Sequence, residues 1–87
     1  MTGWTKNPRV VATDLEQETV LLDPQTRRLF TLNLTGRVVW DRIEDGLADV
    51  IAVIVARFEV DEESARIDSC ALIDRLCEAG LVTRRDP

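Results

Sequence analysis

The stretch ETVLLDPQTRRLFTL, residues 18–32, has the pattern of two β-strands joined by a turn. Residues 18–23 contain the branched and aliphatic side chains that strands favour. Residues 23–26 read Asp-Pro-Gln-Thr, which puts proline at the second position of a turn, where its fixed φ suits the chain reversal. Residues 28–32 then alternate between the two faces of a strand. The stretch therefore predicts a β-hairpin, which needs further elements to bury its apolar side.

A third strand is predicted just upstream of the hairpin. Residues 9–13 read Arg-Val-Val-Ala-Thr, a short run of β-branched character, and residues 15–17 would turn the chain. Residues 1–8 show little periodicity, so we expect a flexible N-terminal arm there. The polar residues 83–87 are expected to form a flexible tail. The predicted folded domain is therefore 9–82.

Helical spacing replaces the strand pattern after the hairpin. Asn33 or Thr35 would cap a first helix, and Gly46 would end it. The β-branched run at residues 50–55 would suit a strand. However, apolar residues recur at intervals of four, three and four between Leu47 and Phe58, which fits a buried helix better. A second helix is therefore predicted.

The third helix has the clearest boundaries. Asp61 would cap its start, two glutamates in the first turn favour the helix dipole, and Gly80 would end it. The predicted order is βββααα. Neither the strands nor the helices can bury their apolar surface alone, and stacking the helices on one side of the sheet solves this. The predicted fold class is α+β: a winged-helix-like domain with a three-stranded antiparallel sheet followed by three helices.

The composition argues against an enzyme. The chain of 87 residues allows one domain and contains no histidine and no tyrosine. The lack of histidine removes the commonest general base and most transition-metal sites. The four glycines are isolated, so there is no glycine-rich phosphate loop. We therefore expect no catalytic residues, no metal and no cofactor.

Charge and hydropathy argue against two classes of partner. The net charge is −5, and the predicted third helix carries six acids against two arginines, so phosphates would be repelled. The longest apolar stretch, residues 50–56, is too short to span a bilayer, and the N-terminus has no apolar signal segment. We expect a cytoplasmic protein without nucleic-acid or membrane partners. Cys70 and Cys77 are too far apart along one helix for a disulfide and are expected to be buried free thiols.

The edge of the predicted sheet is the first candidate binding surface. A three-stranded sheet has open edges, and the strand at 28–32 is short and free of proline. A peptide added there would gain main-chain hydrogen bonds, with side-chain pockets supplying selectivity. The same edge would also permit pairing with a second copy of the chain.

One shoulder of the third helix is the candidate pocket wall. On a helical wheel this shoulder consists of Arg66, Cys70, Ile73 and Cys77. Ile67 lies further round, where a purely structural helix would favour a polar residue. The apolar members of the shoulder fit an ordinary core equally well, and a lone exposed isoleucine is common.

Several segments together resemble the PqqD-like family, the recognition elements of ribosomally made and post-translationally modified peptides. They are Val20-Leu21-Leu22-Asp23, Leu32-Asn33-Leu34-Thr35-Gly36, Val39-Trp40, Leu72-Ile73-Asp74-Arg75-Leu76 and Gly80-Leu81-Val82. The Leu-Asn-x-x-Gly segment followed by an aromatic residue is the most specific part. The resemblance covers about residues 9–82.

The resemblance implies a non-catalytic domain that binds the leader segment of a precursor peptide. The leader would add as a strand and lie in a groove between the third strand and the third helix. On this sequence the strand corresponds to Arg28, Leu29, Phe30, Thr31 and Leu32. Combined with the wheel, the helix wall is expected at Arg66, Ile67, Cys70, Ile73, Asp74 and Cys77. Asn33 and Gly36 are expected to shape the helix entry, with glycine where a Cβ would crowd.

Within the family, the chain looks most like the stand-alone accessory proteins of lasso-peptide biosynthesis. Those deliver a precursor to a leader-cleaving protease and a modifying enzyme. The alternative within the family is its namesake, which presents a peptide to a radical SAM enzyme in quinone-cofactor biosynthesis. An alternative from another class is a winged-helix DNA-binding regulator, which would place the acidic third helix in the major groove.

Overall fold

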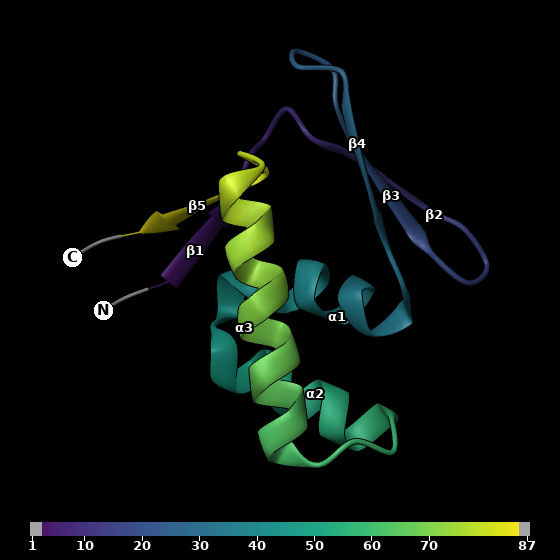
Figure 1. Ribbon diagram of the computed structural model, residues 1–87, viewed down its shortest axis with the longest axis vertical. Helices are drawn as coiled ribbons and strands as arrows, with labels where there is room; N and C mark the ends of the chain where they lie inside the picture. Colours follow the sequence, from purple (N-terminus) through teal and green to yellow (C-terminus); the bar gives the residue numbers. More distant parts are fainter. Residues whose placement is uncertain (1–2, 86–87) are drawn as a thin grey trace.

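Three strands followed by three helices form the central run of elements, which confirms the predicted order. The computed structural model describes residues 3–85 (Figure 1). In chain order the elements are β1 (Gly3–Lys6), β2 (Val11–Asp14), β3 (Thr19–Asp23), β4 (Arg28–Leu32), α1 (Leu34–Arg42), the 3-10 turn η1 (Ile43–Asp45), α2 (Leu47–Arg57), α3 (Glu62–Glu78) and β5 (Val82–Arg85).

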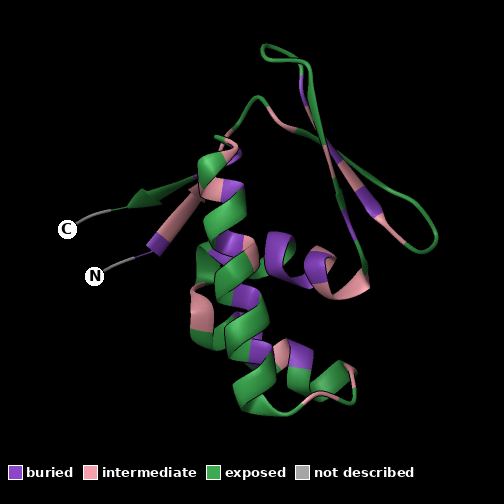
Figure 2. Cartoon of the chain, in the orientation of Figure 1, coloured by how far each residue is buried: buried purple, intermediate pink, exposed green. Residues whose placement is uncertain are grey.

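The larger sheet is antiparallel, in the order β2-β3-β4, so β3 is central and β4 lies at one edge. In its register, Leu21 pairs with Ala12 on one side and with Phe30 on the other. Leu21 and Leu32 are buried against the helices, whereas every residue of β2 is exposed (Figure 2). The sheet therefore packs on the helices mainly through β3 and the end of β4.

A second sheet joins the two ends of the described chain, and here the structure departs from the sequence-based expectation. β1 pairs antiparallel with β5, from Gly3 opposite Arg85 to Lys6 opposite Val82. Most of the expected arm and tail thus has paired-strand geometry, while residues 1–2 and 86–87 lie outside the described part. Strands of four residues show no usable periodicity. The main-chain bonds between two distant segments stabilise this pairing.

A side-chain cap marks the start of α1, whereas Asp61 precedes α3 without a side-chain cap hydrogen bond. Asn33 caps α1, since its side-chain oxygen accepts a hydrogen bond from the Gly36 N–H at 2.8 Å. A Cβ on Gly36 would come within 3.1 Å of the Leu32 Cβ, which explains glycine at this close approach. Residues 47–57 are helical, as their spacing predicted, with Val50, Ile51 and Ile54 buried.

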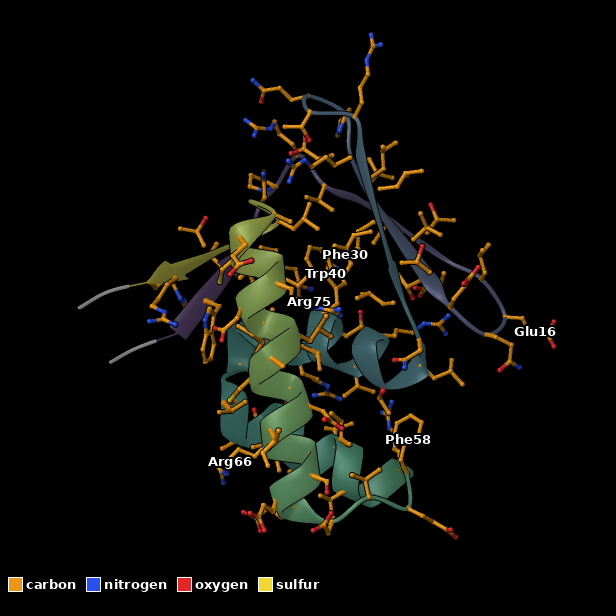
Figure 3. All side chains as sticks on the ribbon, in the orientation of Figure 1. Glu16, Phe30, Trp40, Phe58, Arg66 and Arg75 are labelled. Carbon is orange, nitrogen blue, oxygen red and sulfur yellow. The ribbon has the colours of Figure 1, made fainter. Side chains whose placement is uncertain are left out.

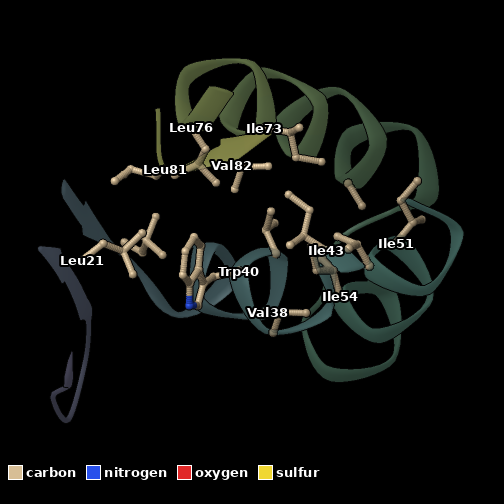
Figure 4. Close-up of a cluster of buried hydrophobic side chains, with 14 residues drawn as sticks. Leu21, Val38, Trp40, Ile43, Ile51, Ile54, Ile73, Leu76, Leu81 and Val82 are labelled. Carbon is tan, nitrogen blue, oxygen red and sulfur yellow. The ribbon is translucent and has the colours of Figure 1, made fainter. Parts of the chain in front are cut away.

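The hydrophobic core lies between two layers of helix, with the sheet closing one side (Figure 4). Val38, Trp40 and Ile43 contribute from α1 and η1, and Ile73 and Leu76 contribute from α3. Full burial of one such aliphatic side chain stabilises the fold by about 1.5–3 kcal/mol. Trp40 is 5% exposed and is the largest side chain in this core.

Arg37 of α1 attaches the β2–β3 end of the sheet to the helices. Its guanidinium donates to Thr19 Oγ1 at 2.7 Å and to the carbonyl oxygens of Leu15 and Glu18. It also pairs with the Asp14 carboxylate at 3.5 Å. Thr19 is fully buried and itself donates to Asp14 at 2.7 Å. One side chain thus holds the β2–β3 turn and both flanking strands in place over α1.

Candidate functional site

β4 has an open edge, because it pairs with β3 on one side and with no other strand in the described chain. The ladder is closed at the β2–β3 turn by a bond from the Leu15 N–H to the Glu18 carbonyl. In an antiparallel ladder, hydrogen-bonded and non-bonded pairs alternate. The bonded pair Leu15–Glu18 fixes which pairs of β2 and β3 are bonded, and the register of β3 with β4 carries the same alternation across the sheet. At Leu29 and Thr31 the main-chain N–H and C=O groups therefore point away from β3. These groups are therefore available to an added strand.

A groove of about 510 Å³ lies beside this edge, between the end of β4 and α3. Thr31 and Leu32 line it from the strand, and Val39 and Ile54 form part of its apolar floor. The wall from α3 consists of Ala65, Asp68, Ser69, Leu72 and Arg75. The site therefore combines free main-chain groups with an apolar floor and a partly polar wall.

Polar side chains surround the groove with both signs of charge. Glu18 and Asp68 are acidic members of its lining, and Arg75 is the basic one. Arg75 also lies over the half-buried Phe30 ring, with its guanidinium carbon 5.5 Å from the ring centroid (Figure 3). The mixed charges favour selection of particular side chains over general attraction to one sign of charge.

Ser69 is a buried polar residue in the groove wall. It is 2% exposed, and its hydroxyl has no hydrogen-bond partner within the described chain. An unsatisfied buried hydroxyl costs about 1–3 kcal/mol, so a ligand group that reached it would recover part of that energy.

The predicted strand residues make up β4, the edge strand beside the groove. Arg28, Leu29 and Thr31 are exposed, and Phe30 is half-buried. Leu32 is 2% exposed, so its side chain belongs to the core even though it also borders the groove floor. The structure thus brings together the open main chain of β4 and the groove.

The predicted helix residues are not in the groove. Ile73 is core, while Ile67, Cys70 and Asp74 are exposed on another side of α3. Arg66 bonds to Glu62 and borders a different hollow, against α2. Cys77 is half-buried and is absent from the groove lining. The six positions predicted on α3 thus form no wall beside β4.

The groove wall is the opposite flank of α3, which carries Asp68, Leu72 and Arg75. A helical wheel gives the centre of the core stripe but does not show which flank faces the sheet. The apolar character of Ile67 and Cys70 favoured a flank that is exposed to solvent and does not line the groove. The one available signal was Leu72, a large apolar residue on the flank that otherwise reads as polar.

The cysteines also differ from expectation, since Cys70 is exposed and Cys77 is half-buried. Burial raises the pKa of the Cys77 thiol above its ordinary value; Arg84 lowers this pKa and Asp74 raises it by smaller amounts. No disulfide joins the two.

Two further observations concern metal binding and membrane insertion. No group of three or more potential metal-ligating side chains gathers anywhere in residues 3–85. None of the helices in the described chain has the length and hydropathy needed to cross a membrane.

The fold and the open strand edge beside a groove define a small winged-helix-like domain with a peptide-sized cleft. Residues 18–82 match the model of the family described as coenzyme PQQ synthesis protein D (PqqD), and the chain belongs to this family. No curated protein sequence is significantly similar to the chain.

Two solved structures share the fold over nearly the whole chain. One is TbiB1 in complex with the TbiA(beta) leader peptide, with 26% identity, a TM-score of 0.78, and coverage of 90% of this chain and 93% of that one. The other is lasso peptide synthetase B1 complexed with the leader peptide. It has 28% identity, a TM-score of 0.80, and coverage of 93% of this chain and 98% of that one.

Proposed function

We propose that this protein binds the leader segment of a ribosomally made precursor peptide, without catalysing a reaction itself, in lasso-peptide biosynthesis. The leader adds as a fourth strand to the free edge of β4 and lies in the groove against α3. The protein then presents the bound precursor to a leader-cleaving protease and a modifying enzyme. The exposed, unpaired thiol of Cys70 suits the reducing cytoplasm, where we place this step.

The observation that carries the proposal is the open edge of β4 directly beside the groove. Main-chain groups of Leu29 and Thr31 supply affinity that does not depend on the ligand's side chains, and Asp68, Leu72 and Arg75 supply selectivity. The two related structures are complexes with leader peptides, which supports a peptide as the ligand.

The family description supports a second candidate, in which the peptide is presented to a radical SAM enzyme during quinone-cofactor synthesis. The site would be the same and only the peptide and the enzyme would differ. One of the two similar structures is described as a lasso peptide synthetase, which favours the first candidate. A DNA-binding role finds less support, because Asp68 and Asp74 are among the exposed acids of the helix that would enter the major groove.

A fluorescence-polarisation titration with a labelled leader peptide tests the proposal. Thr31→Pro removes a main-chain donor from the free edge of β4, while the ladder to β3 keeps its hydrogen bonds. Ala12→Pro is the matched control, because by the same alternation Ala12 presents its N–H at the opposite free edge, on β2. We expect saturable binding by the wild type and by Ala12→Pro, and at least tenfold weaker binding by Thr31→Pro.

Two results would contradict the proposal. Equal binding by wild type and Thr31→Pro, with both proteins folded by circular dichroism, would rule out strand addition at β4. No binding by the folded wild type to leaders from either pathway would rule out the peptide-carrier role altogether.

A further inference from the structure

An apolar row crosses the face of the larger sheet that points away from the helices. Val11 pairs with Leu22, and Leu22 pairs with Leu29, so the three side chains lie side by side on one face. Val11 is 53% exposed and Leu29 is 68% exposed. Adjacent large apolar side chains on three strands form a contiguous patch, which monomeric proteins seldom leave open without use.

This outer face is separate from the groove. The alternate positions in the same strands, Leu21 and Phe30, point to the other side and pack toward the helices. The groove is lined by the β2–β3 turn, the end of β4, and the three helices, and it contains neither Val11 nor Leu22. A peptide in the groove, paired with the β4 edge beside Leu29, would therefore leave free the part of the outer face formed by Val11 and Leu22.

The charges around the apolar row have one sign, although the chain as a whole has a net charge of −5. Arg9 and Arg27 are exposed at this end of the sheet, and Arg28, also exposed, lies on the same face of β4 as Phe30. Residues 9–13 and 24–31 contain no acid, and the carboxylate of the neighbouring Asp23 is buried and accepts a bond from the Gln25 N–H. Figure 3 shows several nitrogen-tipped side chains gathered around the β3–β4 turn.

We propose that this outer face docks the leader-cleaving enzyme, through a strip on that enzyme that is apolar and bordered by carboxylates. The inference rests on the proposed function, because such an enzyme acts on a peptide that is already held by this protein. The part of the face formed by Val11 and Leu22 stays open when the groove is filled, and the arginine border of the face complements an acidic surface. Among the described helices, the exposed large apolar residues are Val55 and Ile67, which lie on different helices.

Charge substitutions at Val11 test the proposal, since this residue lies on β2, away from the edge that would hold the leader. Val11→Glu places a carboxylate opposite an acidic border, whereas Val11→Lys places a cation there at similar size. Val55→Glu and Val55→Lys make the same changes on the exposed surface of α2 and serve as controls. The assay measures cleavage of the precursor by the purified leader-cleaving enzyme as a function of carrier concentration.

We expect Val11→Glu to raise the half-saturating carrier concentration at least about tenfold, the effect of losing a central interface contact. Val11→Lys should raise it less, and both Val55 variants should match the wild type. Leader affinity, measured separately by polarisation, should be the same in all five proteins. Light scattering should show a monomer at the assay concentrations.

Wild-type cleavage kinetics for Val11→Glu, with leader binding intact, would overturn the docking inference alone. A wild-type dimer that Val11→Glu converts to monomer would also overturn it, because the face would then be occupied by a second copy. Failure of the wild type to bind the leader would instead contradict the proposed function, so the two failures are distinguishable.

Discussion

Arg75 lies over the ring of Phe30, with 5.5 Å between the guanidinium carbon and the ring centroid, and this contact joins α3 to β4. Phe30 belongs to the strand whose edge is open, and Arg75 belongs to the helix that forms the facing wall. A cation–π contact at an exposed site contributes about 0.5–1 kcal/mol. The two walls of the groove are therefore connected by a weak contact that a bound side chain could replace or extend.

Arg75→Met should weaken leader binding several-fold while leaving the fold nearly as stable. Methionine keeps the length of the side chain and removes the only basic group that residues 3–85 contribute to the groove lining. Arg66→Met is the control, because Arg66 lies on the same helix but borders a different hollow. Polarisation titrations and urea denaturation of both variants measure the two effects. Equal leader affinities for both variants would show that Arg75 does not contact the peptide.

Thiol labelling should map which flank of α3 the leader covers. In a background with Cys70→Ser and Cys77→Ser, the Asp68→Cys substitution introduces one thiol in the groove wall. Bound leader should protect this thiol from a maleimide. In the otherwise wild-type chain, Cys70 should react at the same rate with and without leader, because it is exposed outside the groove. Mass spectrometry of the labelled protein gives both rates. Protection of Cys70 by bound leader would instead show that the peptide lies against the flank of α3 that the helical wheel suggested.

Cys77 should react slowly with iodoacetamide and should accelerate as the pH rises. Burial raises the pKa of its thiol, so at a given pH the folded chain holds less of the reactive thiolate than the unfolded chain. By linkage, this preference for the neutral thiol is a stabilising contribution that is present at low pH and is lost as the pH rises through the raised pKa. Alkylation of a Cys70→Ser variant, folded and in urea, checks this. Equal rates in the two states would contradict it.

Arg37→Met should destabilise the protein by about 1–3 kcal/mol, because buried Thr19 and two carbonyl groups lose their donor. Asp14→Asn should cost less than about 1 kcal/mol, since that carboxylate is largely exposed and asparagine can still accept the Thr19 hydroxyl. Urea denaturation monitored by circular dichroism measures both. A smaller loss for Arg37→Met than for Asp14→Asn would contradict this role of Arg37, because Arg37→Met removes the ion pair to Asp14 as well as the three hydrogen bonds.

The order and type of the elements from β2 to α3 follow from the sequence because their patterns are long and local. The hairpin at residues 18–32 and the helical spacing between Leu47 and Phe58 each depend on neighbours within one element. The Asn33 cap is likewise set by residues three positions apart. Such signals can be recognised in the sequence without knowledge of the tertiary structure.

The β1–β5 pairing and the identity of the groove wall depend on long-range geometry. Gly3 and Arg85 become partners only once the helices have brought the chain ends together. Asp68 and Arg75 read as a solvated helix face, and only the orientation of α3 beside β4 turns them into a wall. The periodicity of a helix does not determine which of its flanks turns toward the sheet.

The pairing of β1 with β5 means that the chain enters and leaves the domain at adjacent points, with Gly3 opposite Arg85 (Figure 1). A domain with adjacent ends can be inserted into a surface loop of a host protein without separating the two ends of that loop. It also permits a circular permutant, in which a short linker joins the strand ends and new termini open between α2 and α3. Because these ends lie apart from the groove lining, a fluorophore or a fused enzyme attached there would leave peptide access unobstructed.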